Sequence, residues 1–172
     1  MLKNLTAPAG PRQLFTAIFL AVAMAAVVGS ALGFEHIGGY IPCALCLEER
    51  LPYYYGIPLM LVAALAAAFK APAVVVRTLL FAGGLLMVWG GILGIYHSGV
   101  EWHWWAGPTS CATSAPGVTT NAGDLLSDLN AKKPPSCDVA ALRVLGLSFA
   151  GWNVVASVIL AAIALQGAFK RA

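Results

Sequence analysis

The chain has 172 residues, of which 60% are hydrophobic and 10% are charged, and its mean hydropathy is +0.82. A water-soluble domain usually carries about 25% charged residues. This composition therefore excludes an ordinary soluble protein and indicates one integral membrane domain over residues 1–172, with the lipid bilayer as its surroundings. The net charge of +3 follows from the membrane topology described below, so no nucleic-acid partner is expected.

Four apolar stretches are long enough to cross the bilayer, because a helical span needs roughly 20 mainly apolar residues. Backbone polar groups in lipid must be satisfied within the segment, which favours helices. The first stretch is longer than the apolar region of a secretory signal, about 7 to 15 residues, so we interpret it as an uncleaved helix. The sequence predicts an all-α four-helix bundle with spans over residues 14–33, 51–69, 78–96 and 144–165.

The basic residues are distributed asymmetrically between the two ends of this bundle. Cytoplasmic loops of membrane proteins carry an excess of Lys and Arg. All seven acidic residues fall in the loops 34–50 and 97–143, which we therefore expect outside the cytoplasm. The termini and the second loop, which we expect to be cytoplasmic, carry basic residues and no acidic ones: Lys3, Arg12, Lys70, Arg77, Lys170 and Arg171.

Two further patterns concern packing and the long third loop. Glycines spaced four apart allow helix backbones to approach closely, and this pattern occurs twice, in Gly29 with Gly33 and in Gly90 with Gly94. In the third loop, a helix start near Gly123 is followed by leucines on one side of the expected helix. We expect a short amphipathic helix there, lying on the membrane surface.

All four cysteines fall in the two loops assigned to the outer, oxidising side. Cys43 and Cys46 form a C-x-x-C motif, whereas Cys111 and Cys137 are 26 positions apart. An even number of cysteines in an oxidising compartment favours disulfides. In a C-x-x-C pair the neighbouring thiol can resolve a mixed disulfide quickly, and the thiolate pKa is often depressed. This pair is therefore interpreted as redox-active.

Other interpretations of the cysteines were compared with this one. A structural zinc site commonly uses two close-spaced cysteine pairs, and only one is present, so no metal is expected. Haem attachment is excluded because Leu47, not His, follows Cys46. Cys111 and Cys137 could instead form a static clamp, worth roughly 3 to 4 kcal/mol by a chain-entropy estimate. The spacing alone leaves this alternative open.

Arg50 lies where the first loop enters the second helix, seven residues after Cys43. Its side chain could extend to the lipid headgroups. Alternatively, its donors could hydrogen-bond a carbonyl oxygen of a quinone and stabilise the negative charge that develops on reduction. The residues alone do not decide between these interpretations.

The run PCALCLEER, from Pro42 to Arg50, resembles the first periplasmic loop of the DsbB family, the bacterial disulfide bond formation proteins. The order of four helices, the C-x-x-C, the two separated cysteines and the sequence Leu145-Gly146-Leu147 also match the family, over nearly the whole chain. The resemblance implies an inner-membrane thiol:quinone oxidoreductase, because a relay of DsbA, DsbB and quinone keeps the bacterial periplasm oxidising.

The resemblance also implies a role for each matched residue. Cys111 matches the cysteine that forms a mixed disulfide with a DsbA-like thioredoxin-fold oxidase, and Cys137 matches its resolving partner. Cys43 matches the cysteine that exchanges between the loops, Cys46 the one that contacts quinone, and Arg50 the quinone-binding arginine. Ubiquinone is the favoured cofactor and menaquinone the alternative. Three histidines receive no role: His97, shifted by one from the family position, and His36 and His103, interpreted as interfacial.

Three competing functions were considered. Vitamin K epoxide reductases are also helical quinone-linked enzymes, but their separated cysteines precede the C-x-x-C, whereas here Cys43 and Cys46 come first. A DsbB-like branch could serve a dedicated partner. A non-enzymatic four-helix scaffold with structural disulfides is the third alternative, and its cysteines would stay oxidised in the presence of a reduced thioredoxin-fold protein.

Overall fold

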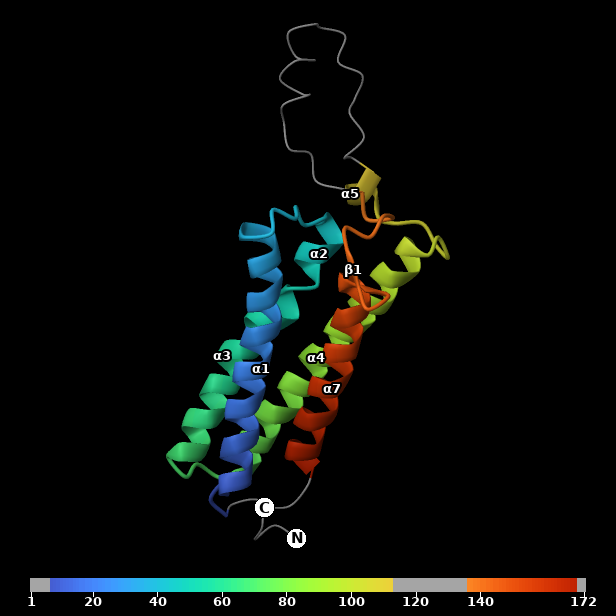
Figure 1. The fold of residues 1–172 in the computed structure, drawn as a ribbon. Coiled ribbons are helices and arrows are strands. Elements are labelled where there is room, and N and C mark those ends of the chain that lie inside the picture. The colour runs from blue at the N-terminus through green and yellow to red at the C-terminus, as the bar shows by residue number, and fades with distance from the viewer. Residues whose placement is uncertain (1–6, 113–135, 170–172) are drawn as a thin grey trace, which may run out of the picture.

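The structure is a computed structural model that describes residues 7–112 and 136–169. Within these residues the long helices run side by side as an elongated bundle (Figure 1). Four segments are long and apolar enough to cross a membrane, which confirms the predicted multi-pass membrane protein. They are α1 (Pro11–His36), α2 (Ala44–Glu48) continuing into α3 (Leu51–Ala68), α4 (Ala73–Glu101) and α7 (Phe149–Phe169).

The helices pack through small residues and methionines along the bundle axis. α4 packs against both α3 and α7, while α1 packs against α3 and α7. A Cβ atom added at Gly94 would lie 2.8 Å from Val154 Cγ2 and 3.2 Å from the Ala150 carbonyl oxygen, so close helix approach is confirmed there. The same expectation is wrong for Gly29 and Gly33, where an added Cβ would meet nothing within 4 Å.

The predicted span 144–165 is wrong at its start, because a short hairpin precedes the last helix. Strands β1 (Arg143–Val144) and β2 (Leu147–Ser148) pair antiparallel. Leu145 and Gly146 join them with positive φ angles of 52° and 85°, as a two-residue hairpin turn of type I′ requires. The Trp152 indole N–H donates to the Val144 carbonyl at 2.9 Å and fixes the hairpin to α7.

The other spans differ from the prediction mainly in length. Helix α4 begins at Ala73 and ends at Glu101, so it extends beyond both ends of the predicted 78–96. The first loop contains α2, a helical turn that was not predicted. In the third loop a short helix, α5 (Thr109–Ala112), carries Cys111. The amphipathic helix expected near Gly123 lies outside the described residues.

One end of the bundle is formed by the start of α1, the α3–α4 connection and the end of α7. Pro8 pairs with Pro72 in an isolated antiparallel bridge. The Arg77 side chain donates to the carbonyl oxygens of Ala168 and Phe169, at 2.5 and 3.0 Å, at the C-terminal end of α7. α2, α5 and the hairpin lie at the opposite end (Figure 1). This second end carries the cysteines.

Candidate functional site

Cys43 and Cys46 are held by the first turn of α2. Cys43 is the N-cap residue, with extended backbone, and its sulfur accepts a hydrogen bond from the Cys46 backbone N–H at 3.2 Å. An N-cap side chain normally bonds the N–H two or three positions later, so the C-x-x-C spacing brings the second cysteine back towards the first. Both are free thiols, Cys43 buried and Cys46 partly exposed.

The Cys43 thiol lies immediately before the second apolar span, Ala44–Ala68. Its pKa is lowered from the ordinary value chiefly because the Cys46 side chain hydrogen-bonds to its sulfur. Burial opposes this effect, and the Cys46 backbone N–H adds to it. Thiolates, not thiols, are the nucleophiles of disulfide exchange. A lowered pKa at Cys43 therefore favours the thiolate form of this sulfur when the inner pair is reduced.

Cys111 and Cys137 are joined in a disulfide, with their Cα atoms 5.6 Å apart. Both sulfurs are buried, and they pack in one apolar cluster with Cys43, Leu45 and Val100. The structure thus brings the outer pair next to Cys43, although the two pairs lie in different loops. The resemblance implied the pairing of Cys111 with Cys137.

A third group of residues, which the sequence analysis did not assign, completes this end of the bundle. His97 on α4 is 3% exposed, and its Nε2 lies 3.6 Å from Cys43 Sγ. Its Nδ1 lies 2.6 Å from Glu49 Oε1. An ionised carboxylate can only accept a hydrogen bond, so Nδ1–H is the donor to an ionised Glu49. Glu49 and Glu101, both taken as loop residues in the sequence, are buried on helix ends. The four-residue spacing of His97 and Glu101 was the only local signal for this cluster.

Arg50 is the N-cap residue of α3, and its side chain does not extend freely into solvent. Its Nη1 lies 2.5 Å from Glu35 Oε2, and the Arg50 side chain is only 11% exposed. This ion pair links the end of α1 to the start of α3 and holds the guanidinium at the wall of a cavity. The headgroup interpretation of Arg50 therefore loses support.

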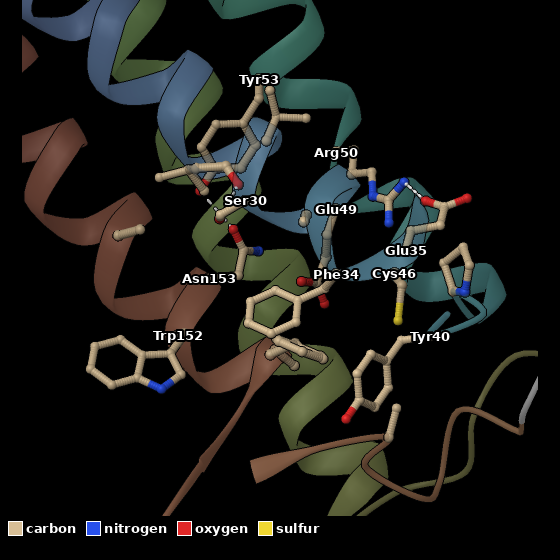
Figure 2. Close-up of a pocket in the computed structure, with 18 of the residues that line it drawn as sticks. Ser30, Phe34, Glu35, Tyr40, Cys46, Glu49, Arg50, Tyr53, Trp152 and Asn153 are labelled. Atoms are coloured by element: carbon tan, nitrogen blue, oxygen red, sulfur yellow. Dashed lines mark hydrogen bonds and ion pairs between the residues drawn. The ribbon is translucent and has the colours of Figure 1, made fainter. Parts of the chain in front are cut away.

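A cavity of about 390 Å³ lies between α1, α3 and α7, near the hairpin. Its lining includes Cys46, Arg50 and Glu49 together with aromatic side chains such as Phe34 and Trp152. Figure 2 shows Cys46 and Arg50 on one side of this cavity and Trp152, on α7, on the other. Its volume and mostly apolar lining with a few polar groups are typical of a site for a small organic molecule.

The inner wall of the cavity contains a polar cluster that crosses the bundle. The Tyr53 hydroxyl on α3 donates to Asn153 Oδ1 at 2.7 Å and lies 3.0 Å from Ser157 Oγ, both on α7. Asn153 Nδ2 in turn donates to the Gly90 carbonyl on α4 at 3.3 Å. Three helices are therefore connected beside the cavity by side-chain hydrogen bonds. Figure 2 shows two of the residues involved, Tyr53 and Asn153, next to one another.

Replacing Tyr53 by Phe should lower the free energy of unfolding by about 0.6 to 1.7 kcal/mol, which are the average and the largest values found for interhelical hydrogen bonds in a membrane protein. The ring still packs, but the hydrogen bonds to α7 are lost. Unfolding of the purified protein in detergent measures the change. Tyr55→Phe is the matched control, because Tyr55 lies on the same helix and is 58% exposed. Equal effects of the two variants would contradict a stabilising role of this cluster.

Comparison with known proteins gave one family. The family model described as "Disulfide bond formation protein DsbB" matches residues 12–167, which is most of the chain and includes all four cysteines. No curated protein and no solved structure gave a significant match.

Proposed function

Because the chain belongs to the DsbB family of disulfide bond formation proteins, we propose that it reoxidises a DsbA-like dithiol oxidase in the periplasm and passes the electrons to a membrane quinone. The single observation that carries this proposal is the position of the inner cysteine pair. Cys43 packs against the Cys111–Cys137 disulfide, while Cys46 lines the cavity beside Arg50. The C-x-x-C thus lies between a disulfide that a soluble partner could reduce and a cavity that a lipid-soluble acceptor could enter.

The first step is exchange with the soluble partner. A thiolate of the reduced partner attacks the Cys111 sulfur, a mixed disulfide forms, and the Cys137 thiolate leaves. The second partner thiolate then attacks the mixed disulfide, so that the partner leaves oxidised and Cys111 and Cys137 remain reduced. One disulfide is broken and one is formed, and two electrons have moved to the outer pair.

The second step transfers these electrons within the protein. A thiolate of the outer pair attacks the oxidised inner pair at Cys43, and Cys46 is released as the leaving group. The second outer thiolate then resolves the resulting mixed disulfide, which restores Cys111–Cys137 and leaves the inner dithiol. His97 Nε2, which Glu49 orients through Nδ1, lies close enough to Cys43 to exchange a proton with its sulfur.

The residues of the large cavity fit a quinone. Its walls are mainly apolar, and Arg50 offers fixed hydrogen-bond donors next to Cys46. A bound quinone supplies an acceptor for two electrons and two protons. With a quinone bound, the Cys43 and Cys46 thiols would give up two electrons and two protons as they close their disulfide, and the Arg50 guanidinium would stabilise negative charge at a carbonyl oxygen. Ubiquinone is the favoured acceptor and menaquinone the alternative.

The proposed location is the bacterial inner membrane, with both termini in the cytoplasm and the cysteine loops in the periplasm. Three of the five described basic residues, Arg12, Lys70 and Arg77, lie near the start of α1 and the α3–α4 connection, whereas Arg50 and Arg143 lie at the opposite end with the cysteines and all the described acidic residues. This separation agrees with the excess of Lys and Arg in cytoplasmic segments. Labelling of single cysteines from either side of sealed membranes tests the orientation.

Replacing Arg50 by Ala should raise the apparent KM for ubiquinone about tenfold or more, because a hydrogen bond to a charged group is worth about 1.5 to 3 kcal/mol. The rate at saturating quinone should fall less. Turnover of the purified protein with a reduced DsbA-like partner, measured over a range of ubiquinone concentrations, gives both constants. Arg50→Lys should recover only part of the loss, since an ammonium lacks the planar donor fork.

Arg143→Ala provides the matched control, because Arg143 is an exposed arginine at the same end of the bundle. This variant should leave the quinone KM unchanged. An Arg50→Ala protein with the same quinone dependence as the original protein would remove Arg50 from the proposed binding site.

A further inference from the structure

A second, much smaller cavity shares Cys46 with the lining of the large one. Its volume is about 20 Å³, and its lining includes Cys43, Cys46, His97 and Glu101. A space of at least about 10 to 15 Å³ can hold one water molecule. The cavity therefore has room for a single ion or water but not for an organic ligand, and four side chains with metal-binding atoms surround it.

The donor atoms in this cavity are spaced as ligands of one metal ion. The sulfurs of Cys43 and Cys46 and a ring nitrogen of His97 all lie within 4.8 Å of one another. Zinc binds thiolate sulfur at about 2.3 Å and imidazole nitrogen at about 2.0 to 2.1 Å in tetrahedral geometry, so these two atoms should be about 3.6 Å apart. The observed distance between Cys43 Sγ and His97 Nε2 is 3.6 Å.

His97 also has the orientation of a metal ligand. Its Nδ1 is hydrogen-bonded to Glu49 Oε1 at 2.6 Å, which leaves Nε2 directed at the sulfurs. Histidines that bind metals almost always donate their other ring N–H to a carboxylate or carbonyl oxygen. Glu49 therefore occupies the position of the outer carboxylate in a carboxylate–histidine–zinc arrangement.

Glu101 is an independent indication of a ligand site in this cavity. Its side chain is buried, 9% of the residue being exposed, and its Oε2 has no hydrogen-bond partner among the described residues. Its Oε1 lies 3.9 Å from His97 Nε2. Neighbouring oxygen and nitrogen ligands of tetrahedral zinc are about 3.4 Å apart, so a small rotation would bring this carboxylate into the fourth position.

We propose that the dithiol form of the protein binds one zinc-type divalent cation through Cys43, Cys46 and His97, with Glu101 as the fourth ligand. The two thiols release two protons when the cation binds, and no electrons are transferred. Oxidation of the pair to a disulfide removes both thiolate ligands, so binding is confined to the reduced state. Local sequence gives no sign of this site, because His97 is 54 residues from Cys43.

One consequence rests on the proposed function. A cation that coordinates both sulfurs prevents them from closing their disulfide, so it should compete with reoxidation by quinone and inhibit turnover reversibly. Removal of the cation by a chelator should restore activity. Cation binding itself requires neither quinone nor partner, so it can be measured separately.

The test uses the full chain in detergent, with Cys111 and Cys137 both replaced by Ser so that only the inner pair can bind. After reduction and removal of the reductant, Cd²⁺ is added and the cadmium–thiolate charge-transfer absorption is followed; Zn²⁺ then competes for the site. About one equivalent should bind. Binding should disappear after oxidation of the inner pair and in Cys46→Ser.

Glu49→Gln should weaken Zn²⁺ binding by about 10 to 100-fold, the usual loss of affinity when the hydrogen-bond partner of a metal ligand is changed. His97→Ala removes a ligand itself and should weaken Zn²⁺ binding by ~100-fold or more. His36→Ala, at an exposed histidine, is the matched control and should bind as before. Unchanged affinity in His97→Ala, or no binding to the reduced pair, would overturn the proposal. If the double Ser variant does not fold, the same titration uses protein that keeps the Cys111–Cys137 disulfide. Cys43→Ser/Cys46→Ser protein then measures any binding that does not involve the inner pair.

Discussion

Replacement of Cys46 or Cys111 by serine should abolish steady-state oxidation of a reduced DsbA-like partner by ubiquinone. Each sulfur takes part in a covalent exchange, and a serine hydroxyl can form no disulfide. Cys111 lies in the outer disulfide and Cys46 at the wall of the large cavity, so the two losses should interrupt the relay at different points. Absorbance of the quinone during turnover measures the effect, which we expect to reach the uncatalysed background.

Partial reactions separate the two variants. Cys111→Ser protein with a reduced inner pair should still reduce quinone once, whereas Cys46→Ser protein should still form a mixed disulfide with the partner. Ser136→Ala, beside Cys137 and exposed, is the control and should turn over normally. Cysteines that stay oxidised in the intact protein when the reduced partner is added without quinone would indicate a structural scaffold instead of an enzyme.

A leucine in place of Gly94 should lower the free energy of unfolding by about 1 to 3 kcal/mol, the usual cost of forcing extra atoms into a packed interior. An added Cβ would lie 2.8 Å from Val154 Cγ2 and 3.2 Å from the backbone oxygen of Ala150, and backbone yields less than a flexible side chain. Helices α4 and α7 would have to separate. Asn153, whose Nδ2 lies 3.2 Å from the same Cβ position, would shift with them and disturb the large cavity.

Gly29→Leu is the matched control for this substitution. Gly29 also lies within a long apolar helix, and an added Cβ there would meet nothing within 4 Å. Both variants gain the same helix propensity, since leucine is a better helix former than glycine. Unfolding in detergent should therefore show a loss of stability for Gly94→Leu alone. Equal stability of the two proteins would contradict the close α4–α7 packing.

The fold could be predicted largely because a membrane restricts the choice of structure. Runs of apolar residues of sufficient length have to be helices in lipid, so all four spans were found. Their ends were less certain, since α4 continues to Glu101 through polar residues that the hydropathy pattern assigns to a loop. The hairpin before α7 was missed because it depends on the positive φ angles of Leu145 and Gly146, and its apolar residues look like helix.

The candidate site was predictable where spacing along the chain carries the chemistry. Cys43 and Cys46 are three residues apart, and Arg50 follows them on the next helix, so local sequence indicates all three. His97 and Glu49 are 48 residues apart, and only the packing of α4 beside α2 brings them together. Glu101 likewise joins these residues only because α4 extends as far as Glu101. Burial of these acids could not be read from a sequence in which they look like loop residues.

The proposed relay requires that electrons reach the quinone from the inner cysteine pair. A single-turnover experiment tests it most directly, using protein in which Cys111 and Cys137 are both replaced by Ser and the inner pair is reduced. We expect added ubiquinone to be reduced by about one equivalent as Cys43 and Cys46 form their disulfide, the stoichiometry of a two-electron couple. The account would be contradicted if this protein left ubiquinone oxidised while a Cys43→Ser/Cys46→Ser protein with a reduced outer pair converted it to quinol.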